Sequence, residues 1–281
     1  AAPSLRELDA LAYGSLLHRA VEELYRAHGA DLVARRRSLA HWEATAVALG
    51  DRLFDAFLAE YPLVGAGIRE KESARLRESL LAFVAYDWGA AEGRRFVGVE
   101  VPFGEGTPLE VSAGGATLHV RGFIDRVDAD AGATLVRDLK SGRAHPRSGD
   151  EADPTPTLDV QIGLYQLAAR KLASAWRTPG MVAAAYVYAS GKGEVEERAF
   201  VSDAAALERA TGAWLATAAR PLHGRLFPAT PDEGDCRYCP FRPLCGTGTV
   251  VRARGGLEET ADGALGDFRA LKLRLGDEEG P

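Results

Sequence analysis

The first third of the chain has the hydrophobic spacing of amphipathic helices. In Leu5–His28 the apolar residues recur at steps of three and four, which places them on one face of a helix. The same spacing predicts helices over Ser38–Tyr61 and Ile68–Ala91, and the proline and glycines between these two interrupt the pattern. We therefore predict that residues 1–95 form an N-terminal helical region.

From Phe96 onwards the hydrophobic period changes to two, which is typical of strands. Phe96–Phe103 alternates, and Leu109–Ser112 is a candidate extension of the same sheet. His119–Val127 and Ala133–Lys140 also alternate, and the Asp- and Gly-containing stretch between them predicts a turn. The pattern therefore predicts a hairpin near the middle of the chain.

The second half mixes the two periods. Residues 96–230 are predicted to form the core, residues 231–250 a cysteine-containing segment, and residues 251–281 an acidic tail with disordered last residues. Ser202 and Asp203 are candidate caps of the last long helix. The elements expected here are a helix over Leu158–Trp176, a buried strand over Met181–Ala189, a strand over Glu194–Phe200 paired with it, and a helix from about Ala204 to Leu226.

Composition narrows the class of protein. The chain has 281 residues and a net charge of −6, which counts mildly against autonomous binding of DNA through its phosphates but allows a local basic groove. No apolar run reaches the ~20 residues of a membrane span, and no signal peptide opens the chain, so we expect no membrane partner. Because the chain starts with Ala-Ala-Pro, we expect it to be part of a longer protein.

The predicted hairpin brings charged residues together. Period two places Asp138 and Lys140 on one face of the second strand, and Asp125 on the first strand could meet them across the hairpin. Two carboxylates with an ammonium beside them are suited to a divalent metal ion. The alternative is a solvated strand edge, because charged side chains mostly face water.

Other polar residues are weaker candidates for the same site. His18 lies on a partly apolar helix face, where it is either a core histidine or a metal ligand, and Gly14 one turn earlier permits a close approach. Glu100 is a further candidate acid or a plain surface residue. Gln161 and Tyr165 share one helix face, where they either contact a substrate and the metal acids or pack in the core.

Residues 141–157 predict a loop directly after the acidic strand. The loop holds Arg143, His145 and Arg147, which either contact phosphates or face solvent.

All three cysteines lie within ten residues of one another. Cys236, Cys239 and Cys245 indicate a metal or cluster site rather than a secreted disulfide framework, so a reduced, cytoplasmic location is expected. Thiolates suit zinc or an iron–sulfur cluster, and either normally takes four ligands. The fourth could be His223, a residue upstream of Ala1, or nothing at all.

The order of these motifs resembles the PD-(D/E)XK nucleases. GSLLH at 14–18, the acidic strand near Glu100, GFIDRVD at 122–128, DLK at 138–140, QIGLY at 161–165 and the terminal cysteines follow the family's order. More narrowly, the chain resembles the nuclease domain of the RecB and AddB helicase–nuclease subunits and their iron–sulfur relatives in CRISPR adaptation. The likeness runs from about Leu8 to Cys245.

This resemblance implies an α/β fold, with a central mixed sheet flanked by helices as in the restriction-endonuclease-like core, and a role in cutting DNA. It makes Asp125 and Asp138 ligands of Mg²⁺ or Mn²⁺, adds an oxygen from the Leu139 carbonyl, and makes His18 and Glu100 further metal-site residues. Lys140 orients the attacking water, and Gln161 and Tyr165 support the site.

The resemblance also implies a cofactor and partners. Cys236, Cys239 and Cys245 match three of the four ligands of a [4Fe–4S] cluster, and the first cysteine of the pattern has no counterpart in this chain. The implied enzyme is a Mg²⁺-dependent deoxyribonuclease, and the resemblance favours an exonuclease over an endonuclease. It would act in DNA repair and recombination on single-stranded or end-containing DNA, with a helicase subunit or domain, at the nucleoid.

Two other functions fit part of the pattern. A non-catalytic DNA-binding or scaffolding subunit could keep the fold, although a dead copy is free to lose one of Asp125, Asp138 and Lys140. A zinc-knuckle protein without hydrolytic activity would leave the hairpin acids unexplained.

Overall fold

The computed structural model describes residues 7–90, 92–113, 115–142, 160–190, 194–199, 204–237 and 239–259, together with single residues and short pieces between 263 and 273. The chain divides into two compact units. The sheet unit comprises Ala1–Leu109 and Arg121–Glu208, and the cysteine unit comprises Glu110–Val120 and Arg209–Pro281.

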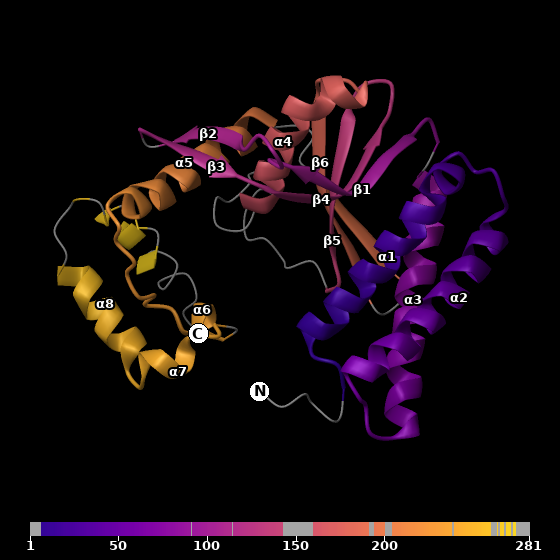
Figure 1. Ribbon diagram of the computed structural model, residues 1–281, viewed down its shortest axis with the longest axis horizontal. Coiled ribbons are helices and arrows are strands. Elements are labelled where there is room, and N and C mark those ends of the chain that lie inside the picture. Colours follow the sequence, from indigo (N-terminus) through magenta and orange to yellow (C-terminus); the bar gives the residue numbers. More distant parts are fainter. Residues whose placement is uncertain are drawn as a thin grey trace. The chain divides into compact units, whose positions relative to one another are not determined.

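The three N-terminal helices form as the spacing predicts. They are α1 (Ala10–Val33), α2 (Leu39–Glu60) and α3 (Ala66–Ala90), and they lie beside one another in the sheet unit (Figure 1). Helix α1 begins five residues later than expected because Asp9 caps it, accepting a hydrogen bond from the amide of Ala12 at 2.7 Å. Ser38 caps α2 in the same way.

A mixed five-stranded sheet forms the centre of this unit. Its strands are β1 (Arg95–Phe103), β4 (Gly122–Ala129), β5 (Thr134–Lys140), β6 (Val182–Ser190) and β7 (Glu194–Ala199), in the order β1-β4-β5-β6-β7. Only β5 and β6 run parallel, and helix α4 (Val160–Trp176) lies between them in the sequence, as a parallel connection requires. The fold is the expected restriction-endonuclease-like α/β fold.

The turn between β4 and β5 is fixed by one side chain. The carboxylate of Asp130 accepts hydrogen bonds from the amides of Gly132 and Ala133, both at 2.7 Å. Such an Asx turn reverses the chain within a few residues, and it sets the register in which β4 and β5 pair.

Two strand predictions were wrong. The expected extension of the central sheet, β2 (Leu109–Ala113), pairs instead with β3 (Ala116–Val120) in a separate two-stranded sheet. The expected continuous strand from His119 to Val127 is likewise interrupted at Arg121, where β3 ends and β4 begins. The reason is local: Gly115 has φ +79°, which L side chains rarely adopt, so the chain reverses there and β2 pairs with its immediate neighbour.

The remaining helices are α5 (Ala204–His223), α6 (Glu233–Cys236), α7 (Arg242–Cys245) and α8 (Thr249–Glu259). Helix α5 ends three residues before the expected Leu226, and α8 replaces part of the expected tail. Ser202, Asp203, the Arg143, His145 and Arg147 loop, and the end of the tail lie outside the described residues. No helix in the described part of the chain is both long and apolar enough to cross a membrane.

The main hydrophobic core lies between the three N-terminal helices and the sheet. Leu17 and Leu24 of α1, Leu80 of α3, and Leu139 and Val187 of the sheet are all buried in it. The central strands pack one face against this core, and this packing fixes the positions of the polar residues at its edge.

Candidate metal site

Three acidic residues lie at corresponding positions of three neighbouring strands. In the β1–β4 ladder Val99 pairs with Arg126 and Val101 with Ile124, which places Glu100 opposite Asp125. In the β4–β5 ladder Arg126 pairs with Arg137, so the next step places Asp125 beside Asp138. Sheet register therefore places Glu100, Asp125 and Asp138 at the same step of the three strands.

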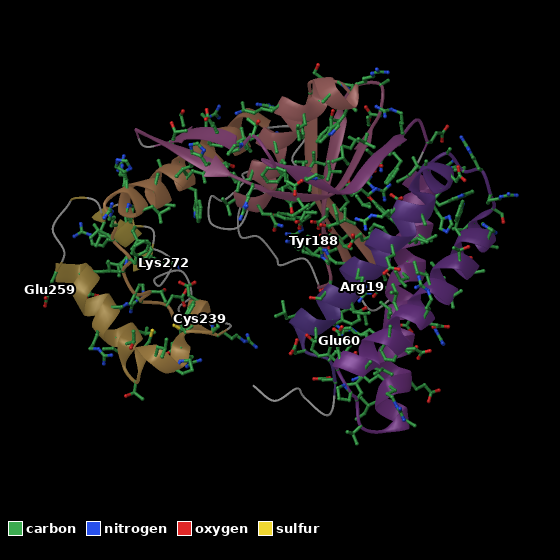
Figure 2. The ribbon with its side chains drawn as sticks, viewed as in Figure 1. Arg19, Glu60, Tyr188, Cys239, Glu259 and Lys272 are labelled. Atoms are coloured by element: carbon green, nitrogen blue, oxygen red, sulfur yellow. The ribbon has the colours of Figure 1, made fainter. Side chains whose placement is uncertain are left out.

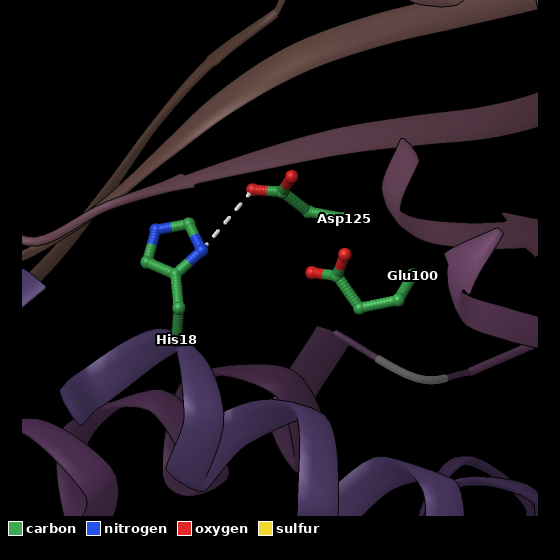
Figure 3. Close-up of side chains that lie close together, drawn as sticks. All are labelled: His18, Glu100 and Asp125. Carbon is green, nitrogen blue, oxygen red and sulfur yellow. Dashed lines mark ion pairs between the residues drawn. The ribbon is translucent and has the colours of Figure 1, made fainter. Parts of the chain in front are cut away.

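A histidine from α1 completes a compact donor group. His18, Glu100 and Asp125 each offer one ligand atom, and these atoms all lie within 4.8 Å of one another. Nδ1 of His18 lies 3.6 Å from Oδ2 of Asp125, and Figure 3 shows the three side chains turned toward one another. One imidazole nitrogen and carboxylate oxygens form a donor set that divalent metal ions accept.

The backbone of Glu100 is strained. Its φ is +45°, and it is the one non-glycine residue with positive φ inside a described strand. A non-glycine residue in this region costs roughly 1–3 kcal/mol, and such strain concentrates at functional sites. The strain reverses the strand's alternation: a Cβ added to Gly98 would meet Val101 at 2.9 Å, although regular pleating puts these residues on opposite faces.

Asp138 is the deepest acid of the row. It is fully buried, and Nζ of Lys140 lies 2.6 Å from its Oδ2. Apart from Lys140, its carboxylate oxygens have no hydrogen-bond partner among the described residues. Burial, with the nearby charge of Asp125, raises the pKa of Asp138 to about 7, although Lys140 opposes the rise. Such a carboxylate gains from a cation, although it lies outside the three-residue donor group.

The same physical causes act on Glu100. Burial, followed by the charges of Asp125 and Glu22, raises the pKa of Glu100 to about 6. Clustered carboxylates with raised pKa values mark a site that is short of positive charge.

A chain of hydrogen bonds connects Lys140 to Asp125. Nζ of Lys140 donates to Oε1 of Gln161 at 2.9 Å, Nε2 of Gln161 donates to the hydroxyl of Tyr165 at 2.9 Å, and that hydroxyl donates to Oδ1 of Asp125 at 3.1 Å. The amide of Leu139 donates to Oδ2 of the same aspartate at 2.9 Å. The structure thus brings these residues together, while metal binding by the Leu139 carbonyl stays a prediction.

Two close approaches accompany the site. Gly14 faces Ser141, whose Oγ would lie 3.1 Å from a Cβ at that position, so the approach expected at this glycine comes from the residue after Lys140. A small cavity lies beside the donor group, and Glu22 lines it together with His18, Glu100 and Asp125. Sequence reasoning missed Glu22, although it stands one helical turn after His18 and the spacing could have indicated it.

A group of buried charges behind the acids was also missed. Arg126 and Arg137 also line this cavity, and Asp87 of α3 and Asp128 of β4 pair with them. The sequence signal was available, because Arg126 and Arg137 directly adjoin the two aspartates of the predicted hairpin. From the sequence, however, these two arginines cannot be distinguished from residues on a solvent-exposed strand face.

The three cysteines lie in the cysteine unit: Cys236 ends helix α6, Cys245 ends helix α7, and Cys239, labelled in Figure 2, lies between them in the sequence. All three are free thiols. Thiolates around one zinc ion lie about 4 Å apart, since each Zn–S bond is about 2.3 Å. In the described part of the chain these three sulfur atoms do not all come within 4.8 Å of one another, a wider spacing than that of thiolates around one zinc ion.

Their fit to an iron–sulfur cluster is partial. The pKa of Cys236 is raised by desolvation and then by the charge of Glu233, while Arg242 opposes the rise. Three thiolates are one short of the four that such clusters take from cysteine. His223, considered as a fourth ligand, does not join them in a metal-binding group among the described residues.

Comparison with known proteins identifies the family. No curated protein matches the chain. A family model, the PD-(D/E)XK nuclease superfamily, matches residues 2–246, a range that includes the donor group, the hydrogen-bond chain and all three cysteines. The match covers most of the chain and agrees with the order of its motifs and with its mixed sheet. The chain therefore belongs to the PD-(D/E)XK nuclease superfamily.

Proposed function

We propose that this protein hydrolyses phosphodiester bonds of DNA with the help of a divalent metal ion, Mg²⁺ or Mn²⁺. The observation that carries the proposal is the row of Glu100, Asp125 and Asp138 across neighbouring strands, with the ammonium of Lys140 at its end. Carboxylates in this number, partly or fully buried, are costly to the fold unless they bind a cation.

The residues that would hold the metal are His18, Glu100, Asp125 and Asp138. Their carboxylate oxygens suit Mg²⁺, which prefers oxygen ligands, and the single imidazole is better suited to Mn²⁺. A bound ion would supply Lewis acidity at the scissile phosphate and lower the pKa of a coordinated water.

Lys140 is placed to assist the water that attacks the phosphorus atom. Its ammonium contacts Oδ2 of Asp138 at 2.6 Å and Oε1 of Gln161 at 2.9 Å, and lies 5.3 Å from the ring centre of Tyr186. These contacts fix its direction, so its positive charge favours the deprotonated form of a neighbouring water. Gln161 and Tyr165 hold Lys140 and Asp125 in a constant relation to each other.

The finer role that we propose is that of a RecB- or AddB-like helicase–nuclease in DNA repair and recombination. The order of the motifs supports it, as do the cysteines after the catalytic core. In this role the enzyme is an exonuclease that takes single-stranded or end-containing DNA from a helicase in the cytoplasm. Cys236, Cys239 and Cys245 would supply three ligands of a [4Fe–4S] cluster.

A nuclease assay tests the proposal. Labelled single- and double-stranded DNA are incubated with Mg²⁺, with Mn²⁺ or with EDTA, and the products distinguish attack at ends from internal cleavage. We expect metal-dependent cleavage that Asp138→Ala abolishes. The matched control is Asp130→Asn on the same hairpin, which keeps an acceptor for the turn amides and should keep full activity.

Two results would contradict the proposal. Substantial metal-dependent cleavage by folded Asp138→Ala would remove Asp138 from the site. A folded wild type that binds DNA but cuts it under no metal would favour the alternative, a non-catalytic DNA-binding or scaffolding subunit with the same fold.

A further inference from the structure

A network of charged side chains lies buried next to the row of acids. Arg126 and Arg137 are each 4% exposed, and Asp87 and Asp128 are 1% exposed or less. The two arginines directly adjoin the two aspartates of the hairpin, and they pair with each other across the β4–β5 ladder. Arg126 and Arg137 therefore form the pair next to Asp125 and Asp138 in this ladder.

One carboxylate from outside the sheet binds both arginines. Oδ2 of Asp87, on α3, accepts from Nη1 of Arg126 at 2.7 Å, and its Oδ1 accepts from Nη1 of Arg137 at 2.8 Å. The hydroxyl of Tyr25, on α1, donates to Oδ2 at 2.6 Å. Asp87 thus ties β4 and β5 together and connects both strands to two helices.

Two other carboxylates contact the arginines, each with one close partner. Asp128 contacts Nη2 of Arg126 at 2.9 Å, and Glu197 of β7 lies 3.5 Å from Nη2 of Arg137. Neither bridges the two strands as closely as Asp87, because Asp128 is 3.8 Å from Arg137. The guanidinium of Arg126 also lies over the ring of Tyr25, 4.1 Å from its centre.

Two cations directly opposite each other in a sheet repel, and the repulsion is strong where water is excluded. A carboxylate between them reverses the sign of the interaction and draws the strands together. Consecutive residues of a strand are only ~3.3 Å apart, so movement at this step moves the neighbouring aspartates as well. Metal sites tolerate displacements of only ~0.5 Å.

We propose that Asp87 is a positioning residue, which sets the separation of Asp125 and Asp138 by holding Arg126 and Arg137 together. The inference rests on the proposed function only in assigning a metal to the two aspartates. A buried ion network of this kind adds little stability compared with well-packed apolar side chains, so geometry is the property that it supplies.

Asp87→Asn tests this role, with two readouts. The first is the affinity for Mn²⁺, measured by paramagnetic resonance without DNA. The second is hydrogen exchange of the Leu139 amide measured by NMR without metal, because that amide donates to Oδ2 of Asp125. The matched control is Ser79→Ala, which removes a different buried contact of α3, the 2.7 Å hydrogen bond to Tyr13 of α1.

For Asp87→Asn at temperatures where the variant is folded, we expect Mn²⁺ affinity to fall at least ten-fold and Leu139 exchange to become at least ten-fold faster. Ser79→Ala should change both by less than two-fold, even if its Tm falls as far. The double variant Asp87→Asn/Arg137→Met removes the uncompensated charge, so its Tm should recover. It does not restore the bridge that draws β4 and β5 together, so its Mn²⁺ affinity should stay low.

The proposal is overturned if folded Asp87→Asn stays within two-fold of wild type in both readouts. It is also overturned if affinity returns together with Tm in the double variant, since Asp87 would then act on stability alone. Should Asp87→Asn not fold, Arg137→Met decides, because it keeps the contacts of Asp87 to Arg126 and Tyr25. Unchanged Leu139 exchange in that variant refutes the proposal.

Failure of the nuclease function is visible separately. A wild type that binds no Mn²⁺ and cuts no DNA contradicts the proposed function. The exchange of the Leu139 amide, which needs neither metal nor DNA, then decides alone whether Asp87 positions the aspartates.

Discussion

Replacing Asp138 by asparagine is expected to stabilise the metal-free protein at neutral and alkaline pH. The pKa of Asp138 is raised to about 7, mainly by burial and then by the charge of Asp125. In the unfolded chain the same carboxyl titrates near its ordinary value of about 3.9. Between these two values the folded protein holds a proton that the unfolded chain has released, so the free energy of unfolding decreases as pH rises through this window.

The size of the effect follows from the two pKa values. Each pKa unit corresponds to about 1.4 kcal/mol, so ionising Asp138 in the fold costs on the order of 4 kcal/mol, reached above pH 7. Entry of water and movement of Lys140 reduce this figure, and we expect about 2–4 kcal/mol at pH 8. For a chain of 281 residues that corresponds to a Tm higher by about 3–7 °C in the variant.

The assay is thermal unfolding in EDTA from about pH 4 to about pH 8, for wild type, Asp138→Asn and the control Asp130→Asn. The curves for wild type and Asp138→Asn should nearly meet at about pH 4 and separate as pH rises toward 7, while the control follows wild type. Mg²⁺ at ten times its Kd should stabilise wild type by about 1.4 kcal/mol and leave Asp138→Asn unchanged.

Parallel pH profiles for wild type and Asp138→Asn would refute the reasoning. They would show that the carboxylate is compensated in the fold, either by Lys140 alone or by water, and is not short of positive charge. A variant less stable than wild type at pH 8 would show that the ion pair with Lys140, 2.6 Å long, outweighs the cost of burial.

Three further predictions concern neighbouring contacts. Glu100→Gly removes the strain of φ +45° and should raise the free energy of unfolding by about 1 kcal/mol while weakening Mn²⁺ binding. Calorimetry measures both quantities, and lower stability would mean that the contacts of Glu100 outweigh its strain. Tyr165→Phe removes the hydrogen bond to Oδ1 of Asp125, which is worth about 1–2 kcal/mol, so kcat should fall about ten-fold while KM for DNA stays unchanged. An unaltered kcat would contradict this role of Tyr165. Gly29→Ala places a Cβ 2.7 Å from the ring of Phe96 and should lower the free energy of unfolding, measured in urea, by about 1–3 kcal/mol without changing Mn²⁺ affinity. Unaltered stability would show that the ring can move aside.

The sequence by itself determined the local structure and the chemical types in the site. Helical spacing gave α1, α2 and α3 to within a few residues at most ends, because apolar periodicity and side-chain caps such as Ser38 act over short distances. Alternation placed Asp138 and Lys140 together, and the structure finds them 2.6 Å apart, since side chains two residues apart share a strand face.

Tertiary structure decided what local patterns leave open. The pairing of β2 with β3 depends on a turn at Gly115, and the position of Glu100 depends on a backbone conformation that no side-chain pattern signals. The network around Asp87 was invisible for the same reason, because its members come from separate helices and strands. Whether a charged residue faces water or a buried partner is set by segments distant in the sequence, and only the folded chain brings those segments together.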